Sequence, residues 1–191
     1  RICLDPTSLN KWIQREHIIL PSADEMLARI KKASTFSKLD LKDGYWQVVL
    51  TEEASKLTTF NSPMGRYRYL RLPFGLNSAN EVFQKRVSQH IEGIRGAIVL
   101  FDDILIHAET PEENSKILHE VFQQCRRAGI KLNPKKCKIG VPEVKYLGHI
   151  ISAEGIAVDP EKVEDLINMP TPEDRAAVQR LLGSLTYLAK F

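Results

Sequence analysis

The chain has 191 residues, 43% apolar and 27% charged, and its 27 basic against 24 acidic residues give a net charge of +3. This balance is typical of a globular protein of one domain, with or without a small appendage, and excludes a disordered or collagen-like chain. The apolar runs, such as 97–101, are far shorter than the roughly 20 residues of a membrane span, and residues 1–5 do not resemble a secretory signal.

The cysteines point to an intracellular protein. Cys3, Cys125 and Cys137 are odd in number and lack metal-site spacing, so we expect reduced thiols. The five histidines are scattered and are predicted to be structural. Because the chain starts without Met and its last residues continue a helical pattern, we expect a piece of a longer polypeptide.

Helix start signals occur five times along the chain. They lie at 22–25, 78–81, 110–113, 159–160 and 171–174. The first two are capping boxes, and the third places a cap, then Pro, then acidic residues. The third helix is predicted to end at Gly129.

Strand patterns fill the intervals between these helices. Residues 36–50 are β-rich but interrupted at 42–44, and segments 58–60 and 67–72 flank a turn as in a hairpin. Further strands are predicted at 97–101, 104–106 and 146–152. Hairpins instead of regular βαβ repeats indicate an α+β fold.

Two adjacent carboxylates, Asp102 and Asp103, interrupt the apolar hairpin formed by the strands at 97–101 and 104–106. Burying neighbouring carboxylates is costly, and tight turns favour Asp-Gly or Asn-Gly over Asp-Asp. A divalent cation would hold both charges. On the hairpin alone, an exposed turn with two incidental acids is an equally good explanation.

A third carboxylate, Asp40, ends the amphipathic segment 36–40. If this segment lies beside the hairpin, Asp40, Asp102 and Asp103 converge at one end of a sheet. Three carboxylates are the usual ligands of two Mg²⁺ ions about 4 Å apart, and Mg²⁺ takes its other ligands from water and phosphates. The chemistry indicated is phosphoryl or nucleotidyl transfer.

Basic and aromatic residues are interleaved further along the chain. Arg66, Arg68 and Arg71 alternate with two tyrosines, a pattern that suits phosphate contact with base stacking. The lysines at 131–138 are more simply explained as a solvated basic face.

The strand–Asp-Asp–strand hairpin resembles the polymerase motif of reverse transcriptases, and the similarity extends over nearly the whole chain. The segments that carry it are 4–10, 15–17, 20–21, 36–40, 44–47, 57–60, 65–67, 72–75, 82–84, 132–134, 136–137 and 146–149. The closest similarity is to reverse transcriptases of gypsy-type LTR retrotransposons. It implies an RNA-directed DNA polymerase that uses Mg²⁺, with Mn²⁺ as a substitute.

The resemblance also implies a right-hand polymerase fold with an antiparallel palm sheet packed on helices. Fingers would comprise 1–36 and 51–77, palm 37–50 and 78–152, and the start of the thumb 153–191. The implied partners are an RNA or DNA template with its primer and deoxynucleoside triphosphates, with no membrane. The implied location is the cytoplasm or retrotransposon particles, in a polyprotein that also carries ribonuclease H.

Residue roles follow from the same resemblance. Asp40, Asp102 and Asp103 match the catalytic carboxylates, with the backbone carbonyl of Leu41 as a further metal ligand. Nucleotide binding would fall to Arg1, Asp43, Gly44, Tyr45 and Phe74. Template and primer would meet Leu72, Pro73, Gly75, Leu100, Phe101, Tyr146, Leu147 and Gly148.

Some of these residues have simpler explanations. Tyr45 would exclude a 2′-OH, yet Tyr45 and Trp46 could also be a strand pair with one ring in the core. Residues 73–75 could be an ordinary turn.

Two positions depart from the family pattern. Leu100 stands where Tyr is usual, and Asn80 follows Ala79 where Pro is common. Leu100 favours lowered activity or a drifted element copy. The alternative function is therefore a weakened or inactive nucleic-acid-binding remnant, against which the intact carboxylates argue. A two-metal nuclease is a weaker rival, because nothing resembles a ribonuclease H core.

Overall fold

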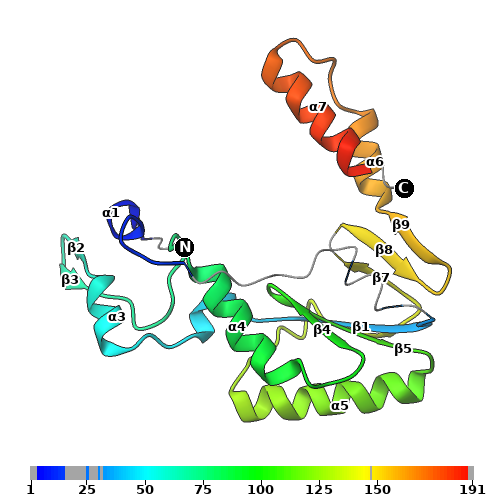
Figure 1. Ribbon diagram of the computed structural model, residues 1–191, viewed down its shortest axis with the longest axis horizontal. Helices are drawn as coiled ribbons and strands as arrows, with labels where there is room; N and C mark the ends of the chain where they lie inside the picture. The colour runs from blue at the N-terminus through cyan, green and yellow to red at the C-terminus, as the bar shows by residue number, and fades with distance from the viewer. Residues whose placement is uncertain (1–3, 16–24, 26–29, 31, 147, 189–191) are drawn as a thin grey trace.

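The computed structural model describes residues 4–15, 25, 30, 32–146 and 148–188. Most of the helix expected after the 22–25 capping box lies outside the described residues, as do Arg1 and Leu147. Figure 1 shows a central sheet with smaller groups of elements on either side. No helix in the described part of the chain is long and apolar enough to span a membrane.

The central sheet is antiparallel and has the strand order β4-β5-β1-β6. The strands are β1 (Thr35–Asp40), β4 (Ala97–Leu100), β5 (Asp103–Ala108) and β6 (Lys138–Val141). The β4–β5 hairpin therefore lies directly beside β1, although more than fifty residues separate them in the sequence.

Two helices cover one face of this sheet: α4 (Ala79–Ile91) packs on β4, and α5 (Pro111–Ala128) packs on β1 and β5. The start and end of α5 are as predicted. The Thr110 hydroxyl accepts a hydrogen bond from the Glu113 backbone N–H at 3.2 Å, and Gly129 ends the helix at φ 69°. Local signals were sufficient here.

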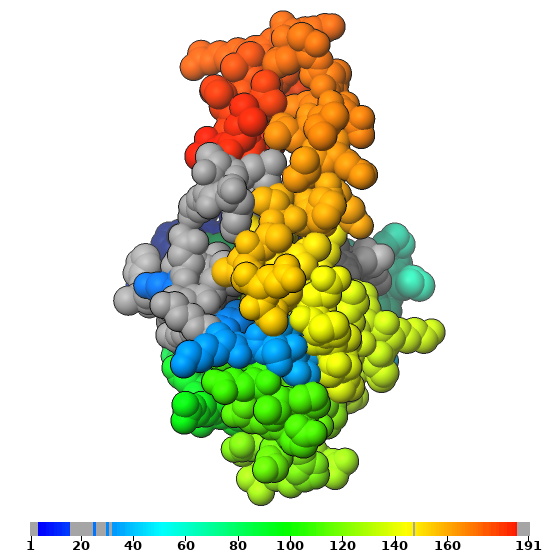
Figure 2. All heavy atoms as spheres, turned by 90° about the vertical axis from the view of Figure 1, so that its right-hand side faces the viewer, coloured from blue at the N-terminus to red at the C-terminus, as the bar shows by residue number. Residues whose placement is uncertain are grey.

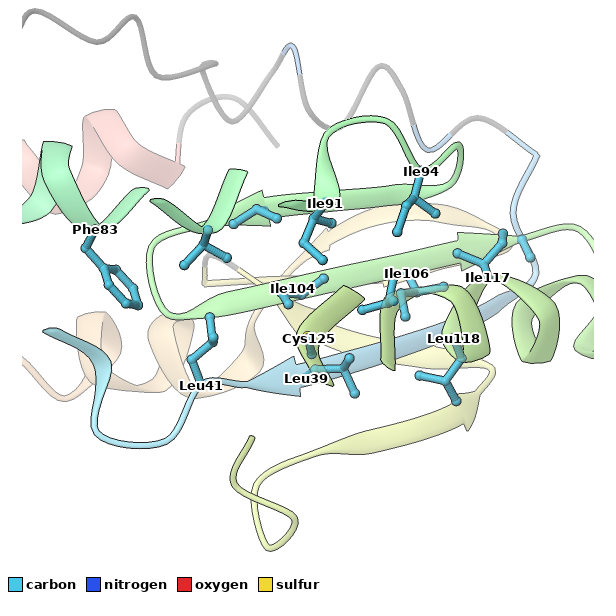
Figure 3. Close-up of a cluster of buried hydrophobic side chains, with 14 of the residues drawn as sticks. Leu39, Leu41, Phe83, Ile91, Ile94, Ile104, Ile106, Ile117, Leu118 and Cys125 are labelled. Atoms are coloured by element: carbon cyan, nitrogen blue, oxygen red, sulfur yellow. The ribbon is translucent and has the colours of Figure 1, made fainter. Parts of the chain in front are cut away.

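Side chains of β1, β4 and β5 alternate between the two faces of the sheet. Leu39, Ile104 and Ile106 point toward the helices and are fully buried, and they share one cluster with Leu118 and Cys125 (Figure 3). Burial raises the pKa of the Cys125 thiol to about 11, so this residue serves as a packing group.

Among the residues that the structure describes, the other face of the sheet is covered by a second sheet of three strands. These are β7 (Glu143–Tyr146), β8 (His149–Ser152) and β9 (Gly155–Val158). Phe36, Leu100 and Leu105 of the central sheet form a second apolar cluster with Val144 and Tyr146 of β7. This face carries the candidate site.

The strand predicted at 146–152 is wrong in its extent. Gly148, with φ 77°, reverses the chain and divides the segment between β7 and β8. The expected palm–thumb boundary at 152 falls between β8 and β9, which pair with each other.

The chain ends in two helices, α6 (Pro160–Ile167) and α7 (Arg175–Leu188), which project away from the central sheet (Figures 1 and 2). The Asp159 carboxylate accepts from the Glu161 N–H at 3.2 Å, as its sequence signal predicts. The last helix begins later than the 171–174 signal, because Asp174 accepts from the Ala177 N–H at 2.6 Å and caps it.

On the opposite side of the central sheet lie α1 (Thr7–Asn10), α3 (Glu52–Leu57) and the hairpin of β2 (Phe60–Ser62) and β3 (Gly65–Tyr67) (Figure 1). A hairpin was expected here, but its strands were predicted at 58–60 and 67–72, further from the turn than the observed β2 and β3. Helix α3 was not expected, although Thr51 caps it by accepting from the Ala54 N–H at 3.2 Å.

The expectation of strand after the interruption at 42–44 is wrong for residues 45–47, whereas Val49 makes an isolated antiparallel bridge to Arg71. Residues Gly44–Gln47 form a 3₁₀ helix, η1, because Asp43 at φ 60° and Gly44 at φ 41° turn the chain out of β1. The second capping box is also not formed. Ser78 makes no side-chain cap, and the Glu81 carboxylate instead accepts from Arg15 Nε at 2.9 Å.

Candidate active site

The sheet register brings the acidic residues to one end of the central sheet. Asp40, the last residue of β1, lies directly opposite Asp103, the first residue of β5. Leu100 faces Asp103 across the β4–β5 hairpin, which leaves Phe101 and Asp102 as the turn. The backbone N–H of Leu41 donates to the Asp102 carbonyl at 2.8 Å and fixes this turn against β1.

Side-chain alternation decides which face these carboxylates share. Asp40 lies on the same face of β1 as Phe36, and Asp103 lies on the same face of β5 as Leu105. Both carboxylates therefore lie on the face opposite α4 and α5, at the end of the strands that carry the second apolar cluster.

The carboxylates repel one another. Burial raises the pKa of Asp102, the negative charges of Asp103 and Asp40 raise it further, and Lys136 opposes the shift. Two lysines compensate the neighbours: Lys38 Nζ lies 2.8 Å from Asp103 Oδ2, and Lys136 Nζ lies 3.7 Å from Asp40 Oδ2.

Lys38 was not singled out from the sequence as a site residue. It lies on β1, two residues before Asp40 and hence on the same face. Its ammonium also lies 5.8 Å from the centre of the Tyr146 ring and 3.5 Å from the Lys145 carbonyl oxygen. Lys38 therefore links the Asp103 carboxylate to β7.

The donor set fits a hard divalent cation. Carboxylate oxygens are the ligands that Mg²⁺ prefers, and the unfavourable charge on Asp102 would be relieved by a cation. Among the residues that the structure describes, no three acidic, His or Cys side chains are already gathered closely enough to hold a metal. Asp103 and Asp40 are turned instead toward Lys38 and Lys136.

A buried amide braces the Asp-Asp turn. Phe101 has φ 52°, a left-handed conformation that costs energy for a residue with a side chain. Its N–H donates to Gln84 Oε1 at 2.7 Å, and Gln84 Nε2 donates to the Val99 carbonyl at 3.0 Å. Gln84 was not predicted as a site residue. Its position on the buried face of α4 with Val87 and Ile91, unusual for a polar residue, is a signal that could have identified it.

The turn that follows β1 lies against the carboxylates. A Cβ on Gly44 would lie 3.1 Å from Asp102 Oδ1, so only glycine fits there without displacement. The next residue, Tyr45, packs its ring on Phe74 at 4.9 Å and on Phe83 at 5.5 Å between ring centres. The alternative that Tyr45 and Trp46 form a strand pair is wrong, because both lie on η1.

The segment 73–75 is held by the start of the described chain. Gly75 has φ 102°, and a Cβ there would lie 2.8 Å from the Leu4 carbonyl oxygen. Asn10 Nδ2 donates to the Gly75 carbonyl at 2.9 Å, and the Asn77 N–H donates to Asn10 Oδ1 at 3.0 Å. This loop is therefore fixed by long-range contacts, beyond what an ordinary turn needs.

Residues 4–151 match the family described as reverse transcriptase (RNA-dependent DNA polymerase). The chain belongs to the reverse transcriptase family. Over its full length it is 34% identical to the retrovirus-related Pol polyprotein from transposon 412 of Drosophila melanogaster. It is 31% identical to the transposon Tf2-3 polyprotein of Schizosaccharomyces pombe. Both relatives are of the gypsy type of LTR retrotransposon. The chain spans 16% and 14% of their lengths.

Solved structures agree with this assignment. A foamy viral protease-reverse transcriptase in complex with double-stranded DNA matches with a TM-score of 0.92 at 27% identity, over 98% of this chain and 33% of that one. Another, in complex with an RNA/DNA hybrid, matches with a TM-score of 0.79 at 26% identity, over 96% of this chain and 25% of that one. The predicted α+β reverse transcriptase fold, with antiparallel sheets packed on helices, is confirmed.

The residues expected at template and primer differ in exposure within this reverse transcriptase domain. Phe101 is 42% exposed, whereas Leu100 and Tyr146 are 6% and 1% exposed and pack together in the second cluster. Leu72 and Pro73 are also buried. The Leu100 side chain therefore serves packing in this structure.

The basic and aromatic segment lies on the β2–β3 hairpin and the strand-like stretch after it. Arg66 and Arg68 are exposed, and the Phe60 ring packs on Tyr67 at 6.2 Å. Arg71 contacts η1 instead, because its Nη1 donates to the Gln47 carbonyl at 3.2 Å.

Proposed function

We propose that this chain is the polymerase part of a reverse transcriptase, which adds deoxynucleotides to a primer 3′-OH on an RNA or DNA template and releases pyrophosphate. The observation that carries the proposal is the pairing of Asp40 with Asp103, with Asp102 in the adjoining turn. Three carboxylates at one sheet end are the donor set of two-metal nucleotidyl transfer.

Divalent ions would be held by Asp40, Asp102, Asp103 and the Leu41 carbonyl. When bound, two Mg²⁺ or Mn²⁺ ions supply activation of the attacking 3′-oxygen and charge stabilisation of the leaving pyrophosphate. Lys38 holds Asp103 in place beside Asp40. Gln84 holds the turn that presents Asp102.

The incoming nucleotide would lie beside Asp43, Gly44, Tyr45 and Phe74, with Arg1 on its triphosphate. The Tyr45 ring supports this proposal, because it is wedged between Phe74 and Phe83 one residue from the Gly44–Asp102 contact. A ring held in this way can exclude a 2′-OH by its position.

Template and primer would pass the remaining residues singled out above, namely Leu72, Pro73, Gly75, Leu100, Phe101, Tyr146, Leu147 and Gly148. We propose fingers at 1–36 and 51–77, palm at 37–50 and 78–152, and the start of the thumb at 153–191. The proposed setting is a retrotransposon polyprotein, in the cytoplasm or in retrotransposon particles.

The test is primer extension on an RNA template with Mg²⁺ and deoxynucleotides, comparing the natural chain with Asp102→Asn. Because the chain spans about a sixth of its relatives, each version is assayed alone and in place of the matching segment of the transposon 412 polyprotein. Extension by the natural version but not by Asp102→Asn supports the proposal. Equal extension by both would contradict it.

A second candidate is a nucleic-acid-binding remnant with little or no catalysis, favoured by Leu100 in place of the usual Tyr. It predicts that the natural chain binds a labelled template–primer but extends it in neither setting. Asp102→Asn would then leave binding unchanged, whereas a polymerase site would show Mg²⁺-dependent binding that Asp102→Asn weakens.

A further inference from the structure

Tyr45 is held by a polar contact as well as by its packing. Its hydroxyl donates a hydrogen bond to Oδ1 of Asn80, in the first turn of α4. The Phe74 and Phe83 rings meet Tyr45 at interplanar angles of 49° and 76°, so they hold the ring from two sides. The free motion of the side chain is rotation about χ1, which displaces its hydroxyl end the most. The bond to Asn80 opposes this rotation, because it holds the far end of the side chain.

The hydroxyl is suited to be the donor of this bond. Burial raises the pKa of Tyr45, and the charges of Asp102 and Glu81 raise it further, so the phenol stays protonated at neutral pH. Asn80 is exposed and lies at the helix start, where an amide side chain is tolerated. Proline, common at this position in related chains, has no side-chain acceptor.

We infer that Asn80 is a positioning residue for sugar selection, which sets the selectivity of this chain for deoxyribonucleotides over ribonucleotides through the Tyr45 ring. The inference rests on the proposed function, because Tyr45 must face the sugar of the nucleotide. It extends that function by naming a residue that acts through Tyr45 without touching substrate.

The contact itself is tested by a double-mutant cycle on unfolding by urea, with Tyr45→Phe, Asn80→Ala and the double variant. If the bond exists, the effects of the two single changes are not additive, since either one removes the same interaction. Additive effects would overturn the inference whatever the activity of the chain. Gln89→Ala, which removes an exposed amide from the same helix, is the matched control and is expected to be neutral.

Selectivity is tested by the ratio of extension efficiencies with deoxy- and ribonucleotides. Asn80→Ala, Asn80→Pro and Tyr45→Phe are each expected to lower this ratio by about two- to tenfold, the factor that corresponds to a typical hydrogen bond. The double variant should lower it no further. Asn80→Asp, which keeps an acceptor oxygen, and Gln89→Ala should keep the natural ratio.

Different results would refute the role of Asn80 and the proposed polymerase function. Primer extension with an unchanged ratio in Asn80→Ala, Asn80→Pro and Tyr45→Phe refutes the inference and leaves the polymerase intact. A natural chain that extends no primer, alone or within the transposon 412 polyprotein, refutes the proposed function and this inference with it.

Discussion

The side-chain amide of Gln84 is hydrogen-bonded to the backbone of Phe101, the residue before the Asp-Asp pair. Gln84 is 3% exposed, and it bonds the backbone on both sides of Leu100, at Val99 and at Phe101. A helix thereby holds in place a turn whose own backbone conformation is unfavourable. The geometry of the Asp-Asp turn thus depends on a side chain from α4.

Replacing Gln84 by Met should therefore lower both stability and primer extension. The change leaves the Phe101 N–H and the Val99 carbonyl without their partner, at a cost of about 1–3 kcal/mol for each group that stays buried and unpaired. Urea unfolding and extension rates measure the two effects. Gln123→Met, an exposed change on α5, should shift stability by no more than about 0.5 kcal/mol. A Gln84→Met chain as stable as the natural one would show that water replaces the amide.

Gly44→Ala should reduce both stability and extension. The new Cβ would lie 3.1 Å from Asp102 Oδ1, and φ 41° is unfavourable for alanine, so we expect a loss of about 1–2 kcal/mol. Gly93→Ala meets no atom within 4 Å and is the control. Equal unfolding midpoints for the two variants would contradict the close approach of Gly44 to Asp102.

Asp102→Asn should abolish extension yet increase stability at pH 7. Because the pKa of Asp102 is raised above its ordinary value of 3.8, ionisation favours the unfolded chain. Stability is therefore lost as the pH rises from 3.8 through the raised pKa, and it stays lower above that. The gain from Asn should be at most about 1 kcal/mol, since the carboxylate is partly exposed and screened.

The pH dependence of the stability gained by Asp102→Asn tests whether the gain comes from removing a charge. Thermal unfolding of the natural chain and of Asp102→Asn is compared between pH 3 and pH 8. The gain should vanish at the acidic end, where the carboxyl is protonated in both the folded and the unfolded state. A gain independent of pH would assign the effect to packing instead of charge.

Lys38→Met should destabilise the chain by up to about 1 kcal/mol, because Asp103 then lacks its 2.8 Å partner beside two other carboxylates. Mg²⁺ should reduce this deficit, since a bound cation replaces the missing ammonium charge. Urea unfolding of the natural chain and of Lys38→Met, with and without Mg²⁺, measures this deficit in stability. Lys56→Met removes an exposed pair with Glu52 and should be insensitive to Mg²⁺. A deficit that Mg²⁺ leaves unchanged would contradict the role given to Lys38.

Leu100→Tyr should raise the extension rate while lowering stability. Tyrosine restores the residue usual in the family, but Leu100 is 6% exposed in a packed cluster, and overpacking costs about 1–3 kcal/mol. Rates are compared per folded molecule, with the folded fraction taken from unfolding curves. Equal rates would show that Leu100 does not limit activity.

Local signals in the sequence were enough for much of the fold. Thr110 and Gly129 mark the two ends of α5, and apolar alternation marks the β4–β5 hairpin, because caps and side-chain periodicity depend on neighbouring residues alone. The sequence also singled out Asp40, Asp102 and Asp103. At the left-handed Gly148 the same patterns predicted too long a strand, and after the correctly predicted interruption at 42–44 they missed the 3₁₀ helix η1.

The tertiary structure decided which residues meet. The register of β1 against β5 pairs Asp40 with Asp103, and the face they share places Lys38 beside Asp103. Helix packing brings Gln84 to Phe101 and Asn80 to Tyr45. The sequence by itself determined the ends of α5, the β4–β5 hairpin and the acidic residues. The contacts between elements were decided only on folding, because they depend on register and packing between segments distant in the chain.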